Sequence, residues 1–148
     1  MKAFSFRLER LLRLRGDAEQ RQAVVLGEAA RAEAEMEGLC RDQHTYLAGM
    51  SDRLQPTVGQ VTSAGMMRTL QLTGLAAANQ LEQAEQERDE ARRRADTERE
   101  RLAEARRERK TLERLKENQR TAWRSEVDRD EQKTMDEIAG RSRGSSLP

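Results

Sequence analysis

The chain has few of the residues that build a compact globular core or a membrane segment. Only 3% of its 148 residues are aromatic and only two are proline. No apolar run approaches the roughly 20 residues that a membrane-spanning helix needs. Residues 1–15 carry Lys and Arg without the continuous apolar core of a signal peptide. We therefore expect neither a membrane-spanning protein nor an ordinary globular domain.

The chain has one cysteine, Cys40, and one histidine, His44. A single cysteine forms no internal disulfide, which favours a reducing compartment and predicts a cytoplasmic protein. The spacing of four residues on a helix allows two metal ligands, but two ligands with only Asp42 nearby do not complete a site. We expect no metal, and interpret Cys40 as a thiol beside a helix seam and His44 as a solvated imidazole.

Catalytic patterns are also missing from the sequence. The glycines occur singly and form no phosphate-binding loop. The carboxylates fall on faces expected to be exposed, where nothing shifts their pKa for acid–base work, and two paired helices offer no deep pocket. The 28 basic and 27 acidic residues are interleaved, which argues against a nucleic-acid partner. We predict a binding protein that is not an enzyme, with no catalytic residue and no cofactor.

What the sequence has in abundance is helix-forming residues. Ala, Leu, Arg, Glu and Gln dominate a chain that is 37% charged, a mixture typical of long solvated helices or coiled coils. The main break is the segment 55–65, which contains Pro56 and Gly59, and Thr57, Thr62 or Ser63 can cap the helix that follows. We predict one all-α antiparallel coiled-coil domain over residues 1–139. Its helices span about 4–54 and 66–139, the turn about 55–65, and a flexible tail 140–148.

Each predicted helix carries an apolar stripe at alternating steps of four and three residues, the period of a coiled coil. In the first helix eleven of fifteen such positions are apolar: Phe4, Leu8, Leu11, Arg15, Ala18, Gln22, Val25, Ala29, Ala32, Met36, Leu39, Gln43, Tyr46, Met50 and Arg53. In the second helix nine of thirteen are Leu or Ala: Leu70, Gly74, Ala77, Leu81, Ala84, Arg88, Ala91, Ala95, Glu98, Leu102, Ala105, Arg109 and Leu112. Two such helices are expected to fold back on each other.

The second helix is predicted to be the longer one. Reflection of the chain about residue 60 places Phe4 opposite Lys116, so the last part of the second helix extends beyond the first. Trp123 falls in this unpaired part, and tryptophan is enriched in binding hot spots. Beyond Leu112 the stripe is expected to change phase, which indicates a different partner.

The two ends of the chain carry its most specific motifs. Phe4–Arg15 reads FSFRLERLLRLR, Arg109–Gln119 reads RKTLERLKENQ, and Glu131–Arg141 reads EQKTMDEIAGR. Together with the layout of a short hairpin and a longer second helix, these motifs resemble the FliJ family of flagellar type III export proteins. The resemblance covers nearly the whole chain.

The resemblance implies a fold similar to the coiled-coil central stalk of rotary ATPases, and a function in flagellum biogenesis. Members of the family insert into the ring of the export ATPase FliI, promote its assembly and link it to the export gate protein FlhA. A role as an export chaperone or chaperone escort is also implied. The chain would then be cytoplasmic and peripheral to the inner membrane through its partners alone.

The same resemblance suggests two groups of contact residues. The ends of the hairpin would bind the ATPase through Phe4, Phe6, Leu8, Leu11, Leu12, Arg15, Trp123, Lys133, Met135, Asp136, Glu137 and Ile138. The export gate would be bound nearer the turn, through Leu39, Tyr46, Met50 and Ala77. The cluster from Phe4 to Leu12 can equally be the closing layer of the helix seam. Two alternatives to the stalk function are a generic scaffolding coiled coil and a chaperone that binds export substrates directly.

Overall fold

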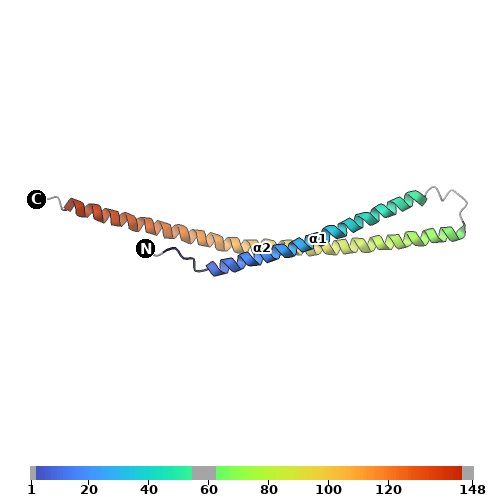
Figure 1. The fold of residues 1–148 in the computed structure, drawn as a ribbon, viewed down its shortest axis with the longest axis horizontal. Coiled ribbons are helices and arrows are strands. Elements are labelled where there is room, and N and C mark those ends of the chain that lie inside the picture. The colour runs from blue at the N-terminus through green and yellow to red at the C-terminus, as the bar shows by residue number, and fades with distance from the viewer. Residues whose placement is uncertain (1–2, 55–62, 145–148) are drawn as a thin grey trace. The chain divides into compact units, whose positions relative to one another are not determined.

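The computed structural model describes residues 3–54 and 63–144, which contain two helices and no strand (Figure 1). Helix α1 spans Glu9–Leu54 and helix α2 spans Ala64–Gly144. The predicted all-α class, with two long helices and a longer second one, is confirmed. Most of the predicted turn, residues 55–62 with Pro56 and Gly59, lies outside the described residues.

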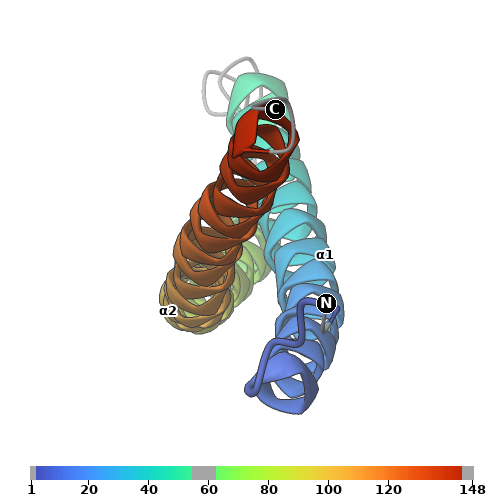
Figure 2. The same ribbon diagram turned by 90° about the vertical axis from the view of Figure 1, so that its left-hand side faces the viewer.

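The beginnings of the two helices follow from local hydrogen bonding. Ser63 caps α2, because its Oγ accepts a hydrogen bond from the backbone N–H of Met66 at 3.3 Å. Helix α1 begins at Glu9 rather than at the predicted Phe4. The backbone N–H of Glu9 donates to the carbonyl of Phe6 at 3.1 Å, and the residues before this turn form a non-helical segment, dark blue in Figure 2.

Helix α2 continues beyond the sequence estimate of Ala139 and ends at Gly144. Gly140 lies inside the helix and has no positive φ angle. A glycine within a helix costs only about 1 kcal/mol relative to alanine. The flanking stretch of helix-forming residues is therefore enough to carry the helix through this position.

The chain divides into two compact units, each of which pairs a part of α1 with a part of α2. Unit 1 comprises residues 1–20 and 104–148, and unit 2 comprises residues 21–103. In unit 1, Glu9 contacts Lys116 and Arg15 contacts Glu108. In unit 2, Gln22 contacts Glu98 and His44 contacts Glu85. In both units residues later in α1 meet residues earlier in α2, so both pairings are antiparallel.

The stripe predicted for α2 is confirmed. All thirteen positions from Leu70 to Leu112 are buried or partly buried. The residues between these positions are exposed, except Glu85. The predicted change of phase after Leu112 is wrong as far as Trp123. The same sequence of steps reaches Lys116, Gln119 and Trp123, of which Lys116 and Trp123 are partly buried and Gln119 is exposed.

The stripe predicted for α1 is correct only in part, and from Gln22 onward only at every second position. Seven of the fifteen positions are partly buried: Phe4, Ala18, Gln22, Ala29, Met36, Gln43 and Met50. The other eight predicted positions, among them Val25, Leu39 and Tyr46, are exposed. The second column of the seam consists instead of Glu19, Leu26, Glu33, Cys40 and Leu47. This column includes two carboxylates, which is why a count of apolar residues passed over it.

The core is small. Within the described residues, the most buried apolar side chains are Phe6, Cys40, Ala77, Ala91, Ala95 and Leu102. Neither α1 nor α2, as far as the structure describes them, has an apolar stretch able to cross a membrane.

Candidate protein-binding surfaces

An aromatic layer closes the paired part of unit 1. The rings of Phe4 and Trp123 lie with their centroids 5.9 Å apart at a tilt of 48°, a favourable arrangement for two aromatic groups. Phe6 is only 6% exposed. The expectation that Trp123 lies on an unpaired helix is therefore wrong, because the non-helical segment before α1 extends far enough to cover it.

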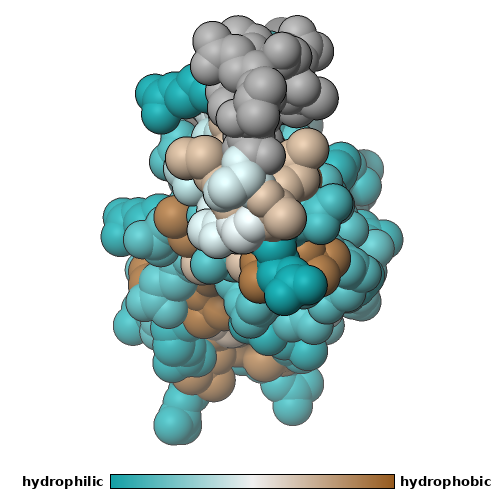
Figure 3. Space-filling model, turned by 90° about the vertical axis from the view of Figure 1, so that its right-hand side faces the viewer, coloured by the Kyte–Doolittle hydropathy of each residue, from teal (hydrophilic) through white to brown (hydrophobic). Residues whose placement is uncertain are grey.

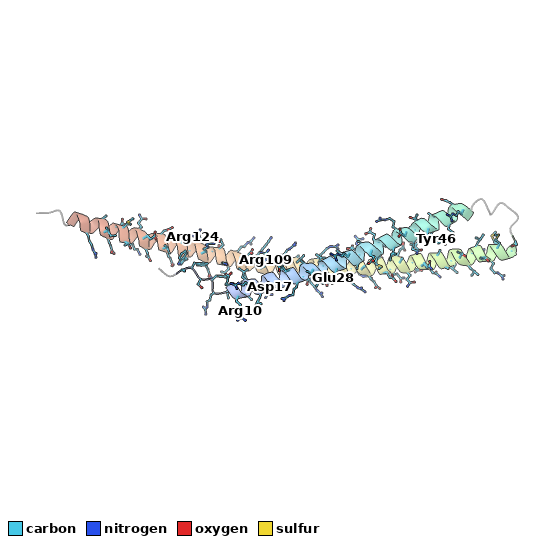
Figure 4. The ribbon with its side chains drawn as sticks, in the orientation of Figure 1. Arg10, Asp17, Glu28, Tyr46, Arg109 and Arg124 are labelled. Carbon is cyan, nitrogen blue, oxygen red and sulfur yellow. The ribbon has the colours of Figure 1, made fainter. Side chains whose placement is uncertain are left out.

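Next to this layer, ion pairs link α1 and α2. Asp17 of α1 and Arg109 of α2, labelled in Figure 4, mark the two facing stretches. Glu19 accepts hydrogen bonds from Arg109 and, at 3.3 Å, from Arg106. The hydrogen bond from Arg109 is the main reason that the pKa of Glu19 lies below its ordinary value of 4.5. Arg15, one of the predicted ATPase contacts, pairs with Glu108 at 2.7 Å.

The last part of α2 has no such cover. Val127 is partly buried, and every described residue from 128 to 141 is exposed. Met135 is 70% exposed and Ile138 is 59% exposed. Because they are three residues apart on a helix, their side chains share one face. Asp136 and Glu137 are exposed beside them, and Lys133 pairs with Asp130 of its own helix at 3.6 Å.

The remaining predicted ATPase contacts lie near the start of α1. Leu8 and Leu11 are a little over one-third exposed, and Leu12 is partly buried. The predicted set thus falls into two groups. Phe4, Phe6 and Trp123 pack within unit 1, whereas Leu8, Leu11, Met135 and Ile138 keep apolar surface at the outside.

The seam of unit 2 is polar as well as apolar. Gln22 donates hydrogen bonds to the side chain and to the backbone carbonyl of Glu98, and Arg99 pairs with Glu33 at 2.8 Å. Outside the seam, Glu90 pairs with Arg94, four residues further along α2, at 3.7 Å. Gln43 has a buried side-chain oxygen for which the described residues offer no hydrogen-bond donor.

The predicted gate contacts are distributed over different environments of unit 2. Tyr46 is 54% exposed and, with Met50, lines a groove of about 480 Å³. The groove is formed by Thr45, Tyr46, Gly49, Met50, Arg53 and Leu70. Leu39 is half exposed outside this groove, and Ala77 is buried and offers almost no side chain to a partner. On this end of unit 2, Figure 3 shows brown apolar residues separated by hydrophilic ones.

Three potential metal ligands meet in the middle of unit 2. Cys40 and His44 of α1 lie close to Glu85 of α2, with one ligand atom of each within 4.8 Å of the others. Spacing along α1 alone points to Cys40, His44 and the neighbouring Asp42. It misses Glu85 because this residue comes from the other helix. Reflection about residue 60 places Glu85 opposite Glu35, so the predicted pairing did not bring Glu85 to Cys40 and His44.

Comparison with known proteins identifies the family. The family model of the flagellar FliJ protein matches residues 4–146, nearly the whole chain. No curated protein and no solved structure matches the sequence. The chain therefore belongs to the flagellar FliJ protein family and is a component of the flagellar export apparatus.

Proposed function

We propose that this chain is a stalk-like element that binds the ring of the export ATPase FliI through unit 1 and promotes assembly of the ring. The observation that carries the proposal is the exposed end of α2, where Met135 and Ile138 present apolar side chains on one helical face. A long stretch of helix without cover, rich in charge and carrying two large exposed apolar residues, has the features of a protein-binding surface.

The ion pairs and the aromatic layer of unit 1 give this surface a support. Glu19, Arg106 and Arg109 tie α1 to α2, and the Phe4–Trp123 contact lies just before the uncovered residues. Because these contacts hold the preceding part of α2 in place, the uncovered part loses less conformational entropy when a partner binds it. In this proposal Phe4, Phe6 and Trp123 position the binding segment, and Met135 and Ile138 contact the ATPase.

We also propose that unit 2 couples the ATPase to the export gate protein FlhA. Leu39 and Tyr46 are exposed apolar residues on α1, and Tyr46 borders the groove with Met50 and Leu70. An aromatic side chain beside an apolar groove is a common anchor for a partner side chain. Through FlhA the chain would lie at the cytoplasmic face of the inner membrane without inserting into it.

The ATPase rate of purified FliI with added chain tests the first proposal. We expect the rate and the fraction of assembled ring to rise with the concentration of the wild-type chain. The double variant Met135→Asp/Ile138→Asp should lose most of this stimulation, since it places two charges on the proposed apolar contact. No stimulation by the wild-type chain at any ratio contradicts the proposal.

The chain provides a matched control for that experiment. Leu72 and Leu75 of α2 have the same spacing of three residues, and both are more than 60% exposed. The double variant Leu72→Asp/Leu75→Asp should stimulate FliI as the wild-type chain does. For the gate, Leu39→Ala/Tyr46→Ala should weaken binding to FlhA and leave the stimulation of FliI unchanged.

A direct chaperone function for export substrates is the second candidate. It is favoured by the exposure of Met66, Met67, Leu72 and Leu75 at the start of α2, because methionine-rich apolar surface adapts to varied partners. Co-purification separates the two functions. Recovery of FliI and FlhA supports the stalk, and recovery of a filament or hook protein, lost in Leu72→Asp/Leu75→Asp, supports the chaperone.

A further inference from the structure

We infer that Cys40, His44 and Glu85 form a zinc-binding site that fastens α1 to α2 in the middle of unit 2. The three side chains offer a thiol sulfur, an imidazole nitrogen and a carboxylate oxygen, all within 4.8 Å of one another. This is a ligand set that Zn²⁺ uses in proteins, where three protein ligands leave a fourth position for water. The site is independent of the proposed binding of FliI and FlhA.

The distances require only a small adjustment. A tetrahedral zinc ion holds sulfur, nitrogen and oxygen donors about 3.5 Å apart, as its bond lengths of about 2.0–2.3 Å imply. His44 Nε2 already lies 3.1 Å from Glu85 Oε1. Cys40 and His44 are one helical turn apart on α1, so both face the same way. Rotation of side chains is sufficient to close the remaining gap.

The charges around the site balance when zinc is bound. Binding releases the proton of the Cys40 thiol, so that the 2+ charge of the ion is matched by a thiolate and the Glu85 carboxylate. Arg88 places a positive charge beside the site, with its Nη1 3.5 Å from the Cys40 sulfur. Its charge is matched by Asp89, which accepts a hydrogen bond from Arg88 Nη2 at 2.9 Å.

Arg88 also provides an outer contact of the kind that metal sites use. It donates a hydrogen bond to the Cys40 sulfur, and such a bond is stronger when the sulfur carries the negative charge of a metal thiolate. Outer hydrogen bonds of this kind hold metal ligands in their orientation. Cys40 itself is 2% exposed, while His44 is exposed, so the ion can enter from the His44 side and displace little packing.

Titration of the metal-free chain with Co²⁺, a spectroscopic substitute for Zn²⁺, tests the site. We expect a single equivalent of Co²⁺ to produce a thiolate-to-cobalt charge-transfer band, and Zn²⁺ to displace the cobalt and remove the band. Zinc should also raise the midpoint of thermal unfolding, because it binds the folded pairing of the helices. Absence of the band, or of any zinc effect on unfolding, overturns the inference.

Variants distinguish a site across two helices from binding to α1 alone. Cys40→Ser should abolish the band, and Glu85→Gln should weaken Co²⁺ binding by at least about tenfold. The matched control is Glu82→Gln, which removes an exposed carboxylate from the same helix and should bind as the wild-type chain does. Equal affinities of Glu85→Gln and Glu82→Gln overturn the site. Far-ultraviolet circular dichroism of each variant checks that its helices are retained.

Discussion

Units 1 and 2 pair the same two helices by different means. Unit 1 uses large side chains, with Phe6 buried and Phe4 against Trp123, and adds the ion pairs of Glu19 with two arginines. Unit 2 uses small ones, and its most buried positions include Ala77, Ala91 and Ala95. Small residues let two helices approach closely but remove little apolar area from water. The difference shows that one coiled-coil period accommodates large buried side chains in one unit and small ones in the other.

The largest effect on this contrast is expected from Phe6→Ala. Removal of a buried phenylalanine ring costs about 3–5 kcal/mol through lost burial and the cavity that remains. We expect urea unfolding to show a loss near the lower end, because the site lies at the edge of unit 1. Amide hydrogen exchange should accelerate at residues 9–20 and 104–123. Unchanged exchange in these residues would show that the aromatic layer does not anchor unit 1.

A substitution that adds side-chain volume, instead of removing it, tests unit 2. Ala95 is completely buried, and Ala95→Leu inserts extra volume between the helices at a cost of about 1–3 kcal/mol. Ala78→Leu is the control, since Ala78 is exposed on the same helix and leucine is nearly as good a helix former as alanine. If both variants unfold at the same urea concentration, the two helices of unit 2 are not packed too closely at Ala95 to accept a larger side chain.

A smaller effect of the opposite sign is expected at the glycines of α1. Gly16, Gly27, Gly38 and Gly49 recur every 11 residues, close to three helical turns, so they share one face of the helix. A Cβ atom added to any of them meets nothing within 4 Å. We therefore expect Gly38→Ala to stabilise α1 by about 0.5–1 kcal/mol. Thermal unfolding should shift upward, and a downward shift would reveal a contact at this face.

The smallest effect concerns the ion pairs of unit 1 and appears as a dependence on pH. The pKa of Glu19 is lowered by its hydrogen bond with Arg109. Its stabilising contribution is therefore present above the pKa of the unfolded chain and is lost as the pH falls through the lower pKa of the folded chain. Glu19→Gln should flatten the acid side of the stability curve below pH 4.5.

Asp17→Asn serves as the control for Glu19, because Asp17 is an exposed carboxylate two residues away on α1. It should leave the acid side of the curve close to that of the wild-type chain. If the two variants lose the same pH dependence, the contacts of Glu19 with Arg106 and Arg109 do not hold in solution.

The fold class and the seam of α2 were predictable from the sequence, because leucine and alanine mark the α2 seam at almost every step. Half of the α1 seam was not. Glu19 and Glu33 lie in it because arginines of α2 pair with them, and only a pairing of both helices reveals such partners. The predicted stripe included Val25, Leu39 and Tyr46 because they are apolar, although they are exposed and lie beside the true second column.

The candidate surfaces show the same division. Met135 and Ile138 were predictable as exposed, since they extend beyond the length of α1. The cover over Trp123 was not, because it depends on a non-helical segment whose path no helical period describes. Glu85 was missed for the reason that applies to Glu33, namely that its neighbours belong to the other helix.

The most direct test of the central claim is site-specific photo-cross-linking to FliI. A photo-reactive amino acid is placed at position 138 in one sample and at position 75 in another. Both positions are exposed on α2, with similar exposed fractions. We expect a covalent adduct with FliI from position 138 and none from position 75. Equal adducts from both positions, or an adduct from position 75 alone, would contradict the claim that the end of α2 binds the ATPase.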